Sequence, residues 1–143
     1  MTFLRKVSMA ILLAAIGMLA ANAAEREEKV VYHINDSAVA TAALNNIRNH
    51  LAASPKAKIV VVTHGPGIDF LLEGAKNKNG NPYDATVQEL SMRHNVEFRV
   101  CNNTLEARKI DKAQVIPEAS IVPSGVAEVA RLQIREGYAY LKP

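Results

Sequence analysis

The sequence contains no tryptophan, only three phenylalanines and four tyrosines, and a single cysteine among its 143 residues. A lone cysteine excludes a disulfide framework within the chain. The scarcity of aromatic side chains argues against a single-stranded nucleic-acid binder, because such proteins stack bases on aromatic platforms. What is present is a hydrophobic fraction of 49%, which argues against intrinsic disorder. The chain is therefore expected to fold as one domain around a hydrophobic core.

Residues 1–23 show the three parts of a secretory signal peptide in the expected order. Arg5 and Lys6 form a positive start, residues 7–20 are almost entirely apolar, and residues 21–23 (Ala-Asn-Ala) fit a small-x-small cleavage site. The apolar run is shorter than the roughly 20 residues that a membrane-spanning helix needs. We therefore expect cleavage, export to the periplasm, and a mature single domain of residues 24–143 that carries no membrane segment.

The positive charge of the chain belongs largely to this leader. The formal charge is +3, and Arg5 and Lys6 are the only charged residues among residues 1–23, so a net +1 remains without them. Residues 24–143 contain no block of basic residues. Because binding to a phosphate backbone depends on such charge, nucleic acid is not an expected partner.

Short β-branched runs alternate with helical apolar patterns along residues 24–143, and this alternation predicts an α/β fold. Strands are expected at residues 29–34, 58–63, 96–101, 120–122 and 138–141. Helices are expected around residues 39–51, 68–75, 83–94, 102–110 and 124–136, with a turn at residues 64–67. Strands separated by helices need crossover connections. The sequence therefore predicts a three-layer sandwich with a mainly parallel five-stranded sheet.

Ligands of an open parallel sheet gather outside the carboxyl ends of its strands. The expected strand ends bring His33, His64 and Cys101 to one edge of the sheet, so the functional site is predicted there. His33, His64 and Cys101 also form a conceivable metal-ligand set of two imidazoles and a thiolate. No pair of them has a tight chelating spacing, and the His-Gly-Pro-Gly run at residues 64–67 matches no nucleotide-binding pattern. Neither a metal nor a cofactor is therefore expected.

Cys101 stands where a strand ends and a helix begins. The free N–H groups and partial positive charge of a helix start stabilise a thiolate, and this placement lowers a thiol pKa. Arg99 lies two residues earlier on the same strand face, about 6.6 Å away along the strand. The alternative interpretation is a small buried hydrophobe, which is a common role of unpaired cysteine.

Four segments of the chain resemble the DsrE/DsrF-like sulfur-relay family, in its small secreted branch. They are VVYHINDSAVATAALNNIRNHL (30–51), VVVTHGPGIDFLL (61–72), VEFRVCNNTL (96–105) and VPSGVAEVARLQIREGYAYLKP (122–143). The resemblance implies a five-stranded parallel α/β domain that assembles into homo-oligomers, often trimers or hexamers. It also implies that the cysteine after the third main strand, which is Cys101 here, carries sulfur as a persulfide. The alternation in residues 96–101 leaves Glu97 and Arg99 on a face that is expected to meet another subunit.

Persulfide transfer needs a thiolate that attacks a sulfane sulfur and later departs, and a low thiol pKa favours both. The N–H groups of Asn103 and Thr104 are expected to steady the terminal sulfur, and the side chains of Asn102, Asn103 and His64 to orient it. The remaining expected binding residues are Gly65, Arg99 and His33. With no second cysteine to resolve a disulfide, sulfur has to pass from a donor to an acceptor on another chain. The sequence therefore predicts a periplasmic sulfur carrier. The first alternative is a non-enzymatic oligomeric binding or assembly module with a structural Cys101, and a more distant one is a His/Cys metal-binding protein.

Overall fold

The computed structural model describes residues 27–143, and the expected leader of residues 1–23 lies outside the described residues. Five strands form one sheet in the order β4-β3-β2-β1-β5, and every neighbouring pair is parallel. The strands are β1 (Lys29–Ile34), β2 (Lys58–Thr63), β3 (Glu97–Cys101), β4 (Ala119–Val122) and β5 (Ala139–Leu141). The predicted five-stranded parallel sheet is thus confirmed, with strand starts shifted by at most one residue.

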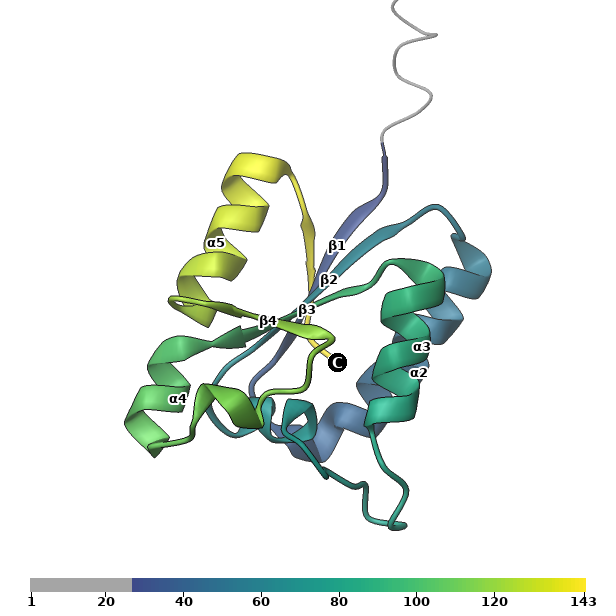
Figure 1. Ribbon diagram of the computed structural model, residues 1–143. Coiled ribbons are helices and arrows are strands. Elements are labelled where there is room, and N and C mark those ends of the chain that lie inside the picture. Colours follow the sequence, from purple (N-terminus) through teal and green to yellow (C-terminus); the bar gives the residue numbers. More distant parts are fainter. Residues whose placement is uncertain (1–26) are drawn as a thin grey trace, which may run out of the picture.

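Helices cover both faces of this sheet. The α-helices are α2 (Ala40–Ala53), α3 (Asp84–His94), α4 (Asn102–Arg108) and α5 (Gly125–Glu136), and the 3-10 helices are η1 (Ser37–Val39), η2 (Gly65–Leu71) and η3 (Lys112–Gln114). Helices α2 and α3 lie on one side of the sheet and α5 lies on the other (Figure 1). The three-layer sandwich is therefore confirmed. Within residues 27–143, no helix has the length and apolar character needed to cross a bilayer.

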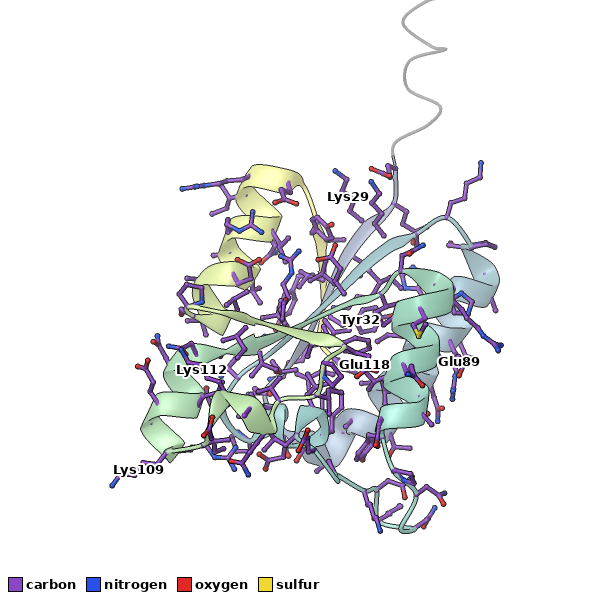
Figure 2. The ribbon with its side chains drawn as sticks, viewed as in Figure 1. Lys29, Tyr32, Glu89, Lys109, Lys112 and Glu118 are labelled. Atoms are coloured by element: carbon purple, nitrogen blue, oxygen red, sulfur yellow. The ribbon has the colours of Figure 1, made fainter. Side chains whose placement is uncertain are left out.

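The alternation of side chains along the strands divides the core into two unequal parts. Tyr32 and its alternate neighbours on β1 join the larger cluster beneath α2 and α3. The smaller cluster lies beneath α5 and consists of Val31, Val60, Val62, Val129, Leu132 and Tyr138. In Figure 2, Tyr32 of the larger cluster lies inside the molecule, whereas Lys109 projects from its surface. Helix α5 is thus attached to the sheet through a small apolar contact with β1 and β2.

The segment after β2 differs from the expected turn and α-helix. It forms the 3-10 helix η2 directly from Gly65, and at Leu72 the chain is already extended. Ile68 and Leu71 are both fully buried, and their spacing of three residues matches the three residues per turn of a 3-10 helix. Close approach also constrains this segment, because a Cβ on Gly67 would lie 2.2 Å from the carbonyl oxygen of Ile34. The 3-10 helix is therefore packed tightly against the end of β1.

Candidate functional site

Cys101 lies at the junction of β3, α4 and the start of α5. It is the last residue of β3 and the N-cap of α4, and its exposed fraction is 5%. Gly125 opens α5 directly against it. A Cβ built on Gly125 would lie 3.1 Å from Cβ of Cys101, 3.2 Å from Cβ of His64 and 3.0 Å from the carbonyl oxygen of Thr63. The absence of a side chain at Gly125 is therefore what lets two helix starts meet at one thiol.

Several hydrogen-bond donors converge on the sulfur of Cys101. Burial raises the pKa of the thiol, but the N–H of Gly125, the hydroxyl and N–H of Thr104 and the N–H of Asn103 outweigh it, so the pKa lies below its ordinary value. The N–H of Asn103 is shared, since it also points to the carbonyl oxygen of Pro123 at 3.3 Å. Donors that face a charged form favour that form. The site therefore stabilises a thiolate at the end of β3.

Gly65 acts on this sulfur through Thr104. The N–H of Gly65 donates to Oγ1 of Thr104 at 2.9 Å, which leaves the hydroxyl proton of Thr104 free to face the sulfur. The carbonyl oxygen of Gly65 accepts a hydrogen bond from Arg108 at 3.3 Å, and Arg108 also pairs with Asp69. Gly65 has a φ of 55°, a left-handed conformation that glycine adopts without steric cost. Both backbone polar groups of Gly65 are thus hydrogen-bonded, and its N–H holds the Thr104 hydroxyl in place.

His33 and His64 lie together on the same side of the sheet. Their ring centroids are 4.8 Å apart, and Nδ1 of His33 is 2.8 Å from the hydroxyl of Tyr140 on β5. Burial lowers the pKa of His33, and the nearby His64 and Lys142 lower it further. The neutral imidazole is therefore the favoured form of His33. Within residues 27–143, no three His, Cys, Asp or Glu side chains are grouped so that they could hold a metal ion.

The two asparagines after Cys101 differ in their surroundings. The side-chain amide of Asn102 donates to Glu106 at 2.7 Å, and its Oδ1 is buried without a hydrogen-bond partner. Asn103 is exposed. Asn102 therefore offers a free acceptor beside the thiol, whereas Asn103 contributes through its backbone N–H.

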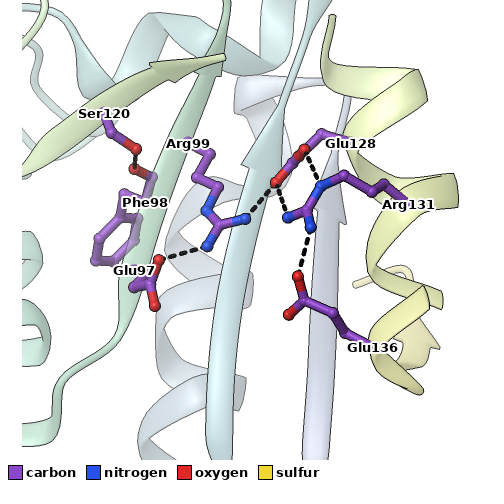
Figure 3. Close-up of polar contacts among 7 residues, drawn as sticks. All are labelled: Glu97, Phe98, Arg99, Ser120, Glu128, Arg131 and Glu136. Carbon is purple, nitrogen blue, oxygen red and sulfur yellow. Dashed lines mark hydrogen bonds and ion pairs between the residues drawn. The ribbon is translucent and has the colours of Figure 1, made fainter.

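Arg99 is engaged elsewhere than the sequence predicts. Its guanidinium pairs with Glu97 at 2.5 Å and with Glu128 of α5, and the side chain is 16% exposed. Figure 3 shows the guanidinium between these two carboxylates. The carboxyl of Glu128 also accepts two hydrogen bonds from Arg131, at 2.8 Å and 2.7 Å. Arg99 thus binds α5, and α5 covers the part of the sheet face that was expected to be open at this residue, while Glu97 stays exposed.

Two residues of this site, Gly125 and Tyr140, could not be predicted from local sequence patterns. Gly125 follows β4, and Tyr140 belongs to β5, so both reach the edge only through the parallel order of the sheet. One signal for Gly125 is present in the sequence. Ser124 caps the helix that begins there, its side chain accepting from the N–H of Ala127 at 3.4 Å, and a capped helix start after a parallel strand marks the ligand edge.

Comparisons with known proteins agree with this architecture. The model of the DsrE/DsrF-like family matches residues 14–143. A protein of unknown function from Methanobacterium thermoautotrophicum, MTH1491, is 30% identical, with a TM-score of 0.72 over 82% of this chain and 100% of that chain. The ychN protein from E. coli shares the fold at 14% identity, with a TM-score of 0.65 over 82% of this chain and 100% of that chain. No curated protein matches the sequence. Because the family model matches nearly the whole chain, the chain belongs to the DsrE/DsrF-like family.

Proposed function

We propose that this protein is an exported sulfur carrier that holds sulfane sulfur as a persulfide on Cys101 and passes it to a partner protein. Membership of a family generally associated with sulfur relay supports the chemistry. The observation that carries the proposal is the meeting of the starts of α4 and α5 at one thiol, and the lowered pKa of that thiol agrees with it. A thiol with a lowered pKa is both more often ionised and a better leaving group, and a sulfur carrier needs both properties.

The loading step is a nucleophilic displacement at sulfur. With thiosulfate as donor, the Cys101 thiolate attacks the outer sulfur and forms a new S–S bond. The S–S bond of thiosulfate breaks, and sulfite departs with the electron pair. Cys101 is left as a persulfide anion, so the charge is conserved. In the unloading step, a thiolate on the acceptor attacks the terminal sulfur, and the Cys101 thiolate departs.

The surroundings of the thiol suit a persulfide anion. The N–H groups of Gly125 and Thr104 and the Thr104 hydroxyl supply donors that a negatively charged sulfur accepts. An exposed fraction of 5% for Cys101 limits the access of oxidants, and oxidation of cysteine follows exposure and thiolate character. The single cysteine of the chain leaves no internal thiol to intercept the sulfur. The acceptor in this proposal is therefore a thiol on another protein.

Intact-mass spectrometry tests the proposal directly. The purified protein is incubated with polysulfide or thiosulfate under anaerobic conditions and weighed before and after reduction. We expect a reducible gain of about 32 Da, the mass of one added sulfur atom, on the wild type. Cys101→Ser is the matched control and is expected to gain nothing. A wild-type thiol that remains unmodified with several donors contradicts the proposal.

The burial of Cys101 favours one competing function, an oligomeric binding or assembly module in which the cysteine only fills space. That function predicts a thiol that titrates near its unperturbed pKa of about 8.5 or does not react at all. The rate of iodoacetamide alkylation as a function of pH separates the two. A profile displaced to lower pH supports the sulfur carrier, and an inert thiol supports the binding module.

A further inference from the structure

A cluster of five charged side chains joins β3 to α5 (Figure 3). Its centre is the pair formed by Arg99 and Glu128, whose side chains are 16% and 11% exposed. Arg131 holds the same carboxylate from within α5, and the carboxylates of Glu97 and Glu136 bind the outer sides of the two guanidiniums. Each charge in the cluster therefore has a partner of opposite sign.

The pair of Arg99 and Glu128 lies next to the contact between Gly125 and Cys101, farther along the same strand and the same helix. Arg99 precedes Cys101 by two residues on the same face of β3, a distance of about 6.6 Å. Glu128 follows Gly125 by three residues on α5, a rise of about 4.5 Å, which is nearly one helical turn. Helix α5 begins at the carboxyl end of β3 and runs back along the sheet. The contact of Gly125 with Cys101 and that of Glu128 with Arg99 are therefore neighbouring contacts between the same helix and strand.

The buried apolar cluster beneath α5 includes no residue of β3. Val129 and Leu132 pack against Val31 of β1 and against Val60 and Val62 of β2. Among the described residues, the buried apolar cluster thus fixes α5 over the middle of the sheet. The ion pair of Arg99 with Glu128 joins the first turns of the helix to β3. The hydrogen bond from Arg131 has the largest effect on the pKa of Glu128 and lowers it. Burial raises this pKa, and Arg99 lowers it again. The pKa of Glu128 therefore lies below its ordinary value, and the pair stays charged.

We propose that Arg99 and Glu128 are positioning residues that clamp the first turn of α5 to β3 and so hold the N–H of Gly125 on the sulfur of Cys101. The inference rests on the proposed role of Cys101 as a reactive thiolate. The clamp acts through the backbone of α5, since the charges of Arg99 and Glu128 largely cancel at the sulfur. Loosening it moves the N–H away and raises the pKa of the thiol.

Glu128→Gln separates a clamp from a simple electric effect, because the two predict opposite signs. If charge alone acted, removing a negative side chain near the thiol would favour the thiolate and speed alkylation. If the clamp acts, the weakened pair releases Gly125, and alkylation by iodoacetamide at pH 7 slows by about three- to tenfold, the change in thiolate fraction for a rise of half to one pKa unit. Glu128→Asp keeps the charge but shortens the reach, so the clamp predicts slowing there as well.

Glu73→Gln is the matched control, since it removes one carboxylate charge from an exposed position outside the cluster and is expected to leave the alkylation profile unchanged. The chain has one cysteine, so the reaction reports Cys101 without labelling elsewhere. Thermal unfolding verifies that each variant is folded, and Glu128→Asp alone decides the matter if Glu128→Gln does not fold. An unchanged or faster alkylation in the folded Glu128 variants overturns the clamp.

The outcome is independent of sulfur transfer. A wild type that gains no sulfur contradicts the proposed function but leaves the alkylation contrast between Glu128 and Glu73 variants intact. If the wild type gains sulfur but the Glu128 variants are alkylated at the wild-type rate, the clamp is contradicted and the proposed function stands.

Discussion

Gly125→Ala tests the contact on which the site is built. A Cβ at this position would meet three atoms at 3.0 Å to 3.2 Å, of which the nearest is the carbonyl oxygen of Thr63. Contacts of this length are tighter than ordinary van der Waals contacts, so α5 or its neighbours have to move by a few tenths of an ångström. The substitution adds one methyl group and keeps the N–H, and its effect on the thiol therefore comes from displacement.

Two opposing terms set the stability of this variant. Overpacking typically costs about 1–3 kcal/mol, while replacing glycine in a helix by alanine gains about 0.5–1 kcal/mol. We expect a net loss of about 1 kcal/mol, which lowers Tm by about 4 °C in a domain of this size. A hydrogen bond to a charged group contributes about 1.5–3 kcal/mol, and losing roughly half of it raises the pKa of Cys101 by about 0.7 unit.

The assay is the alkylation rate of Cys101 by iodoacetamide against pH, combined with a thermal melt of the same sample. At pH 7 we expect alkylation to slow by about fivefold in Gly125→Ala. Val126→Ala is the matched control, because Val126 is the next residue of α5 and its exposed fraction is 60%. A folded Gly125→Ala protein with the wild-type alkylation profile would refute the role of this N–H in stabilising the thiolate.

Three further predictions concern packing, pH and assembly. Gly67→Ala is expected to lose more than about 3 kcal/mol in urea unfolding, because its Cβ would lie 2.2 Å from the backbone of Ile34; a loss below 1 kcal/mol contradicts the close approach. The pKa of Cys101 is lowered by folding, so its contribution to stability is fully present above the unfolded pKa and fades as pH falls through the folded pKa. The Tm difference between wild type and Cys101→Ser should therefore move in favour of the wild type from pH 6 to pH 9, and a constant difference speaks against the shift. Finally, we expect a trimer or hexamer in light scattering at micromolar concentration, with Val126 and Ile134 of α5 exposed at 60% and 83% in the single chain; a monomer argues against assembly.

The fold was predictable because its signals are local and repeat along the chain. The run Lys58–Thr63 is apolar on both faces, as expected for a central parallel strand, and it lies third of five in the sheet. The segment after it was not predictable to the same degree. Residues 65–71 coil as a 3-10 helix with Gly67 packed against the end of β1, a contact between segments that are distant in the sequence. Sequence periodicity over so short a stretch does not carry that information.

The candidate site divides in the same way. Cys101, Asn103 and Thr104 are neighbours in the sequence, and a strand followed by a helix start places their N–H groups near the sulfur by local geometry alone. Arg99 was placed on the correct strand face, but its partner was not foreseen. Glu128 lies on a helix whose position over β3 follows from the packing of the whole sheet. The positive charge of Arg99, which was expected to act on the thiol, is consequently paired with Glu128.

By itself, the sequence determined the parallel sheet, the edge at which chemistry gathers, and the thiol at the end of β3, because these follow from periodicity, chain order and the properties of a helix start. Only the tertiary structure brought Gly125 to the sulfur, gave Thr104 its hydrogen bond from Gly65, and paired Arg99 with Glu128. The physical reason is distance along the chain. Contacts between segments separated by 24 or more residues depend on how helices pack on a sheet, and that packing is settled by the core as a whole.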